Sequence, residues 1–300
     1  MFSVSTNWIP QGELSGEEIV DAIIDIGADA LEVGYFMSPS QLDGLRRCHG
    51  KIPVSSVHAY ASAMGAIPHP EAYILSSRDE SARRRAVQEL GRVGAFAAEM
   101  GASVVVVHGG HLTELTPQIR TLRELAQGGR RHDPTFAKAM DDFMRRREAL
   151  APKYVEALRR SLAEVIPVFE SLNVTVAIEN MPTHHGMPGE HEMQQLLEEF
   201  PSPRFGYWHD FGHGAVKEQY GWIHHEGVLR RALPRLAGMH IHTNEPGAFE
   251  DQHLMPPRGL FAYGRMSLAI PDTLPRVLEP WPGTPADEVR AGLAFLRQHW

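Results

Sequence analysis

Val104-Val-Val-Val-His108 is a continuous apolar run that ends on a histidine. Because its apolar residues are consecutive and do not alternate with polar ones, the run indicates a strand buried on both faces of a parallel sheet. A second run, Val174-Thr-Val-Ala-Ile-Glu179, has the same character and ends on a glutamate. Strands of this kind belong to folds in which helices cover both faces of the sheet.

Strand-like segments recur along the whole chain. They lie at 2–6, 30–35, 54–58, 103–108, 174–179, 205–210, 236–242 and 276–279. Helical patterns separate most of them: the first starts at the capping box Ser15-Gly-Glu-Glu18 and stops at Gly27, and others cover 81–100, 154–172, 190–200, 226–233 and 285–299. No Gly/Ser linker or change of composition divides the series. The alternation predicts a single α/β domain over residues 1–300, a (β/α)8 TIM barrel.

Two segments interrupt this alternation. The first, 111–151, is a long helical and loop insertion after the strand at 103–108, and it includes the charged run Arg145-Arg-Arg-Glu148. Such a run favours a solvated excursion, whereas its position after a barrel strand is also typical of a lid over an active site. The second, 244–263, is rich in Pro and Gly and carries Asp251 and His253.

The composition is that of an ordinary globular protein, with 43% hydrophobic and 22% charged residues. No apolar run reaches the ~20 residues of a membrane span, and the first residues lack the basic start of a secretory signal. The lone Cys48 excludes an internal disulfide and a thiolate-rich zinc site. A net charge of −8 gives no global attraction for nucleic acid. We therefore expect a cytoplasmic protein without a membrane partner, either a monomer or a homo-oligomer.

Residues able to bind a metal ion stand at or just after the ends of the last six predicted strands. They are His58, His108, Glu179, Asp210 with His213, His240 and His242 followed by Asp251 and His253, and Glu279. Imidazole and carboxylate groups are ligands for Zn²⁺, Mn²⁺ and similar ions. Each residue alone is as often or more often structural. Because a barrel brings the carboxyl ends of its strands to one face, the set jointly predicts one converging metal site.

Several short motifs also carry a family resemblance over essentially the whole chain. They are Leu31-Glu-Val-Gly-Tyr35, His58-Ala-Tyr60, Val107-His-Gly-Gly-His111, Ile178-Glu-Asn-Met181, Asp210-Phe-Gly-His213, His240-Ile-His-Thr-Asn244, Asp251-Gln-His253 and Val277-Leu-Glu279. With these motifs the chain resembles the xylose-isomerase-like TIM-barrel superfamily. That superfamily includes sugar isomerases and epimerases and the endonuclease IV group of apurinic-site nucleases.

The resemblance implies a shared metal site made by Glu179, Asp210, Glu279 and one histidine of the strand at 236–242. We favour His242 for this place, because the polar pair and acid that follow it, Thr-Asn-Glu245, match the family, and His240 is the alternative.

The resemblance also implies up to two further ions. In the three-zinc nucleases, positions matching His58 and His108 bind a second ion together with the glutamate that matches Glu179. Positions matching His213, Asp251 and His253 bind a third.

Two enzymatic functions follow from the resemblance. The first is a sugar or sugar-phosphate isomerase or epimerase, in which one Mn²⁺, Mg²⁺, Co²⁺ or Zn²⁺ stabilises an enediolate. Glu179 and Glu279 would exchange the proton as base and acid, and His213 would contact the substrate.

The second is a zinc phosphodiesterase acting on abasic DNA, which the full ligand set favours. Against it, the loop at 36–41 has no arginine to reach a phosphate, and the chain is acidic. We favour the isomerase or epimerase. A metal-binding barrel without activity is disfavoured because Glu179 and Glu279 are both present.

Candidate substrate contacts surround this site. Trp8 and Tyr35, at early strand ends, are expected to form an aromatic wall for a sugar ring, and Tyr60 and His240 are further candidates. Where relatives have a Pro-Gly-x-Gly turn, this chain has Met255-Pro-Pro-Arg-Gly259. Arg258 would bind a substrate phosphate or carboxylate, or would be a plain surface residue.

Overall fold

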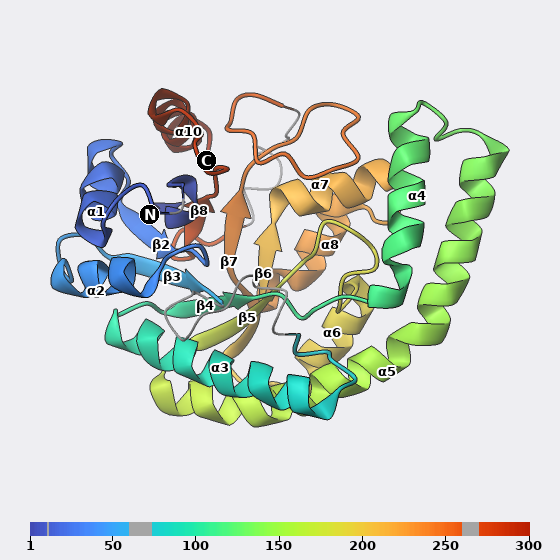
Figure 1. Ribbon diagram of the computed structural model, residues 1–300, viewed down its shortest axis with the longest axis horizontal. Coiled ribbons are helices and arrows are strands. Elements are labelled where there is room, and N and C mark those ends of the chain that lie inside the picture. The colour runs from blue at the N-terminus through green and yellow to red at the C-terminus, as the bar shows by residue number, and fades with distance from the viewer. Residues whose placement is uncertain (11, 60–73, 260–269) are drawn as a thin grey trace.

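A computed structural model describes residues 1–10, 12–59, 74–259 and 270–300. Its parallel strands close into a barrel in the order β1 to β8, as the sequence predicted (Figure 1). The strands are β1 (Phe2–Ser5), β2 (Ala30–Val33), β3 (Val54–His58), β4 (Val104–Val107), β5 (Thr175–Glu179), β6 (Phe205–Asp210), β7 (Leu236–Ile241) and β8 (Arg276–Leu278). Each predicted strand overlaps one of these, so the fold prediction is confirmed.

The run Val104–Val107 explains why the barrel forms. Successive strand residues point to opposite faces, and Val104 and Val106 belong to a small cluster inside the barrel with Trp208. Val105 and Val107 belong instead to the large cluster shared by the strands and the surrounding helices. All four valines are buried, which is why the sequence shows no alternation here.

Most of the surrounding helices were also expected. They are α1 (Gly16–Asp25), α3 (Glu80–Glu99), α5 (Pro134–Leu172), α6 (Glu190–Glu199), α8 (His225–Ala232) and α10 (Ala286–His299). Helix α1 begins with the predicted capping box, in which Ser15 and Glu18 each accept the other's backbone N–H. Two short helices, α2 (Pro39–Arg47) and α7 (Phe211–Tyr220), were missed. Helix α2 overlaps the segment 36–41, which was taken for a loop, and α7 begins within the motif Asp210-Phe-Gly-His213.

The insertion after β4 is largely helical. Helix α4 (Thr116–Gln127) is followed by α5, which continues without a break through the position where a new helix was expected. Figure 1 shows α4 and the first part of α5 standing as a pair at one side of the barrel. Leu122, Phe136 and Phe143 share a hydrophobic cluster with Tyr220 of α7 and with Phe249. The pair is thus packed against the segments that follow β6 and β7.

Within the described ranges, no helix has both the length and the apolar character required to cross a bilayer.

Candidate metal centre

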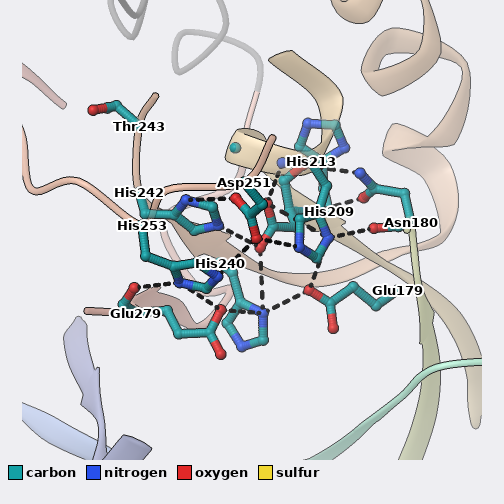
Figure 2. Close-up of polar contacts among 12 residues, drawn as sticks. Glu179, Asn180, His209, His213, His240, His242, Thr243, Asp251, His253 and Glu279 are labelled. Atoms are coloured by element: carbon teal, nitrogen blue, oxygen red, sulfur yellow. Dashed lines mark hydrogen bonds and ion pairs between the residues drawn. The ribbon is translucent and has the colours of Figure 1, made fainter. Parts of the chain in front are cut away.

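The predicted ligands converge at the carboxyl ends of the strands (Figure 2). Each of the nine favoured ligands lies within 4.0 Å of another member of the set or of His240. The contacts that establish this join His58, His108 and His240 to Glu179, His242 to Asp210, His213 to Asp251, and His253 to Asp251 and Glu279. Six strands therefore contribute to one cluster, in which His108, Asp251 and His253 are half-buried and the other members are buried.

We call Glu179, Asp210, His240 and Glu279 the central group. One ligand atom from each lies within 4.8 Å of the others. His240 Nδ1 is 2.8 Å from Glu179 Oε1, 3.4 Å from Glu279 Oε2 and 3.8 Å from Asp210 Oδ2. A single nitrogen faces three carboxylates, an arrangement of donors suited to one divalent cation.

The structure places His240, not the favoured His242, in the central group. Asp210 and His240 are register partners on β6 and β7, so their side chains are neighbours on the inner face of the barrel. His242 lies beyond the end of β7 and reaches only Asp210 among the central carboxylates, with Nε2 3.0 Å from Asp210 Oδ2. These distances do not test which of the two histidines binds a metal, so His242 stays the predicted ligand and His240 stays the alternative ligand and a predicted substrate contact.

A second compact set, here called the outer group, consists of His213, His242, Asp251 and His253. Its ligand atoms also lie within 4.8 Å of one another. Asp251 is at its centre, with Oδ2 2.8 Å from His253 Nε2 and 3.1 Å from His213 Nε2. Three imidazoles and one carboxylate suit zinc or another borderline cation better than Mg²⁺.

Backbone pairing brings Asp251 and His253 back to β7. Thr243 and Leu254 exchange two backbone hydrogen bonds of 2.8 and 2.9 Å, which close the loop between them. His253 has φ of 47°, in the left-handed region that non-glycine residues seldom adopt. Its ring stacks on that of His242 at a centroid distance of 3.8 Å. The loop is thus folded so that two of its side chains meet the strand-end histidine.

The second carboxylate oxygen of Glu179, Oε2, faces two further histidines. This oxygen is 3.1 Å from His108 Nε2 and 3.3 Å from His58 Nε2. His58, Glu179 and His240 form a further group of potential ligands. Glu179 therefore joins His58 and His108 to the central group, as the resemblance implied for a shared carboxylate.

The second nitrogen of several histidines is fixed by a backbone carbonyl. His58 Nδ1 lies 2.8 Å from the carbonyl oxygen of Ala59, and His253 Nδ1 lies 2.8 Å from that of Glu279. His213 Nδ1 lies 2.7 Å from the carbonyl oxygen of Asn180. Because a carbonyl only accepts, each Nδ1 carries the hydrogen, and a neutral ring then presents an Nε2 lone pair to the carboxylates.

The electrostatics of the cluster are those of carboxylates held ionised by imidazoles. Burial raises the pKa of Glu179, but His240, His108 and His58 together hold it well below 4.5. Burial lowers the pKa of His213, but Asp210 and Asp251 raise it to about 10. Likewise, Asp251 outweighs burial and raises the pKa of His253 to about 9. A bound cation would replace these protons as the partner of the carboxylates.

Two buried polar atoms of the outer group show whether a cation fits between its side chains. His242 Nδ1 and Asp251 Oδ1 are buried, and neither has a hydrogen-bond partner in the described part of the chain. They are 3.6 Å apart. Two ligand atoms that each lie about 2.1 Å from one tetrahedral zinc are separated by about 3.4 Å. The residues present therefore fit a metal ion.

Helix α7 fixes Asp210 and His213 relative to each other. Asp210 caps this helix, and its Oδ1 accepts a 2.7 Å hydrogen bond from the His213 backbone N–H. Gly212 lies between them because a Cβ there would stand 1.9 Å from the His242 ring. The motif Asp-Phe-Gly-His is thus a helix start that leaves Asp210 Oδ2 free to face the cluster.

A cavity of about 180 Å³ opens beside the cluster. Tyr35, Glu179, Glu279 and Trp281 are among its lining residues. Tyr35 packs its ring on His58, and Trp281, which is 46% exposed, packs on His253. Burial and then the charge of Glu279 raise the pKa of Tyr35, so it stays neutral. Trp281 was missed in the sequence, although it stands only two residues beyond Glu279.

The other predicted substrate contacts lie elsewhere. Trp8 is buried, and its indole N–H donates to the carbonyl oxygen of Thr284 at 2.6 Å. Arg258 is exposed on its loop, with Nε 3.3 Å from Glu245 Oε1. Neither residue belongs to the described lining of the cavity. Tyr60 lies outside the described residues.

The model of the xylose isomerase-like TIM barrel family matches residues 20–299. A D-tagatose 3-epimerase-like protein has a similar structure, with a TM-score of 0.71, 18% identity, and coverage of 99% of this chain and 96% of that one. No curated protein matches the sequence.

Two further solved structures are similar at comparable levels. The 3-keto-D-glucoside 4-epimerase of E. coli has a TM-score of 0.69 and 15% identity, with 99% and 98% of the two chains covered. The D-psicose 3-epimerase of Clostridium cellulolyticum H10 has a TM-score of 0.69 and 16% identity, with the same coverage of 99% and 98%. At these identities the likeness is one of fold.

Proposed function

Because this chain belongs to the xylose isomerase-like TIM barrel family, as its motifs predicted, we propose that it is a divalent-metal-dependent isomerase or epimerase of a sugar or sugar phosphate. One observation carries the proposal: Glu179 and Glu279 belong to the central group and also line the cavity. Two carboxylates therefore border the same small space from different strands. The names of the similar structures, all sugar epimerases, support the same class.

The cavity suits a small hydroxylated substrate. Its volume of about 180 Å³ is of the order of a monosaccharide. The rings of Tyr35 and Trp281 offer apolar faces for the C–H side of a sugar, while Glu179, His213 and Asp251 offer polar atoms for hydroxyl groups. In this proposal His213 contacts the substrate.

The chemistry proposed is a transfer of one proton. Glu179, Asp210, Glu279 and a histidine of β7 would hold a divalent cation, which when bound would offset the negative charge left by loss of a substrate C–H proton. One glutamate of the pair takes this proton, and the other, protonated beforehand, gives its proton back. Return to the opposite face of the same carbon gives an epimer. Return to the neighbouring carbon, with the hydroxyl proton passing from one of the two adjacent substrate oxygens to the other, gives an isomer.

Glu179 is the better candidate for the ionised partner. Its two oxygens face His240, His108 and His58, which stabilise the carboxylate form. Glu279 makes fewer such contacts, with Oε2 at 3.4 Å from His240 and 3.8 Å from His253. We therefore assign the first proton abstraction to Glu179 and the return to Glu279.

A second candidate function is favoured by the outer group. Its compactness would suit a multinuclear zinc phosphodiesterase acting on abasic DNA. The described lining of the cavity, however, contains no lysine or arginine to meet a phosphodiester backbone. For this reason the isomerase or epimerase is preferred.

The experiment that tests the proposal is a substrate screen on one protein preparation. Metal-free protein is reloaded with Mn²⁺, Co²⁺, Mg²⁺ or Zn²⁺ and incubated with ketopentoses, ketohexoses and their phosphates, with an abasic duplex in parallel. We expect a new sugar to form with at least one ion, and Glu179→Gln and Glu279→Gln to lower its rate about 10²- to 10⁴-fold.

The matched control is Glu198→Gln, at an exposed position near the end of α6, which should keep the wild-type rate. Cleavage of the duplex that is lost in Glu179→Gln, with no sugar conversion under any ion, would support the phosphodiesterase and overturn the proposal.

A further inference from the structure

Three buried side chains behind the ligand cluster have no part in the proposed chemistry. They are Tyr207 and His209 on β6 and His225 at the start of α8, here called the buried network. Successive strand residues point to opposite faces, so Tyr207 and His209 lie on the face of β6 opposite to Asp210. Because a buried polar group is costly without a hydrogen-bond partner, the partners of the network indicate what it does.

The hydrogen bonds of the buried network run in a single direction. Asn180 Oδ1 only accepts, so the Tyr207 hydroxyl, 2.9 Å away, donates to it. Tyr207 has no second hydrogen, so His209 Nδ1 donates to its oxygen, also at 2.9 Å. Burial holds the pKa of His209 well below 6.5, so this ring is neutral and its Nε2 accepts from His225 Nε2 at 2.9 Å. The tautomer of His209 is thereby fixed from both sides.

One end of the buried network reaches the residue that holds Asp210. Asn180 Oδ1 also accepts from the Asp210 backbone N–H at 2.8 Å, and Asn180 Nδ2 donates to the Asp210 carbonyl oxygen. The carbonyl oxygen of Asn180 accepts from His213 Nδ1 at 2.7 Å (Figure 2). The Tyr207 hydroxyl therefore binds the same amide oxygen that orients the Asp210 backbone.

The other end of the network packs against α7 next to His213. A Cβ on Gly214 would stand 2.2 Å from His225 Nε2, so a glycine is needed for the helix to lie this close to the ring. The His225 backbone N–H donates to Glu218 Oε1 of the same helix at 2.9 Å. The network thus ends against the helix that carries His213.

We propose that Tyr207 and His209 are positioning residues that hold the Asn180 side chain, and through it Asp210 and His213, in the geometry that binds a metal ion. Neither residue is a predicted ligand, and neither belongs to the described lining of the cavity, so both act through Asn180. Partners of this kind orient the ligands of a metal and raise its affinity. This role rests on the proposed metal-dependent function, and it does not depend on which histidine of β7 is the ligand.

The test is Co²⁺ binding by metal-free protein, measured by visible absorption and by competition with a chelator. Tyr207→Phe removes only the hydroxyl, and we expect it to weaken the affinity about tenfold and to shift the absorption bands, since loss of a residue that orients a ligand has effects of this size. The matched control is Tyr154→Phe, which removes another buried tyrosine hydroxyl, one that donates to Glu114. It should keep the wild-type affinity and bands.

Two replacements of His209 separate its hydrogen bond from its packing. His209→Asn keeps an N–H donor near the position of Nδ1, whereas His209→Leu removes the donor. We expect His209→Asn to bind Co²⁺ more tightly than His209→Leu. Equal affinities of these two variants would contradict a role through the hydrogen bond to Tyr207.

A double-mutant cycle separates positioning from a general loss of structure. If Tyr207 acts through Asn180, then adding Tyr207→Phe to an Asn180→Ala variant changes the Co²⁺ affinity little further. Equal losses in both backgrounds would overturn the positioning role alone, as would wild-type affinity and bands in Tyr207→Phe. If the wild-type protein itself binds no Co²⁺, the proposed metal-dependent function fails and the positioning role fails with it.

Discussion

The side-chain amide of Asn180 holds the backbone of Asp210 at both of its polar atoms. Asn180 Nδ2 donates to the Asp210 carbonyl oxygen at 2.9 Å, and Asn180 Oδ1 accepts from the Asp210 backbone N–H at 2.8 Å. The carbonyl oxygen of Asn180 also accepts from His213 Nδ1. One residue at the end of β5 therefore positions a ligand of the central group and a ligand of the outer group.

Replacing Asn180 should weaken both folding and metal binding. In Asn180→Ala, the backbone N–H and carbonyl of Asp210 lose buried partners, and we expect a loss of about 2 kcal/mol in the free energy of unfolding. Denaturant titration of the metal-free protein measures this loss, and chelator competition measures the affinity of the loaded protein. Unchanged affinity together with reduced stability would show that Asn180 supports only the fold.

The outer group should bind its own ion. Asp251→Ala removes the carboxylate shared by His213 and His253, and we expect it to lower the metal content of chelator-free protein by one ion per chain. Elemental mass spectrometry of the wild type and the variant measures this. Identical content in the two proteins would mean that the outer group binds no ion under these conditions.

Trp281 should act on substrate binding and not on stability. Because its side chain is 46% exposed, Trp281→Ala should change the free energy of unfolding by less than about 0.5 kcal/mol. We expect its KM for a converted sugar to rise about tenfold through loss of the ring face, and Trp281→Phe to keep most of the binding. A fall in kcat at unchanged KM would place Trp281 in the chemical step instead.

Buried neutral histidines should make the protein sensitive to mild acid. Burial lowers the pKa of His225 from 6.5 to about 4. Between these values the unfolded chain binds a proton that the native protein does not, so stability falls as the pH decreases from about 6.5 to about 4. His225 alone accounts for about 3 kcal/mol of this fall.

Denaturant titrations at several pH values test this dependence. His225→Gln should flatten the profile over that interval, whereas His49→Gln, at an exposed position, should leave it unchanged. Metal release affects all three proteins alike, so the difference between their profiles isolates His225. Parallel profiles of the wild type and His225→Gln would contradict the expected role.

The barrel and the convergence of the candidate ligand residues could be predicted from the sequence because both follow from local patterns. A run such as Val104–Val107 has to be buried on both faces, and that fixes the parallel sheet. The closed barrel then fixes where the strand ends meet. His58, His108 and Glu179 were identified in this way from single strands, without knowledge of their partners.

The choice between His240 and His242 could not be made in the same way. Both lie on one strand face, and their depth in the barrel depends on the register between β6 and β7, which shifts between Tyr207 and Trp208. Register is a property of two strands together. Glu32 on β2, whose Oε2 lies 3.0 Å from His240 Nε2, was missed for a related reason, because the two residues are 208 positions apart along the chain.

The most direct test of the proposed function is the fate of the transferred proton. The metal-loaded protein converts its sugar in D₂O, and NMR locates deuterium in the product. If Glu179 and Glu279 transfer the proton, the product carries deuterium at the carbon that is epimerised or that gains hydrogen. Both the conversion and the labelling are then lost in Glu179→Gln. A product formed without deuterium, or labelling that persists in both Glu179→Gln and Glu279→Gln, would contradict it.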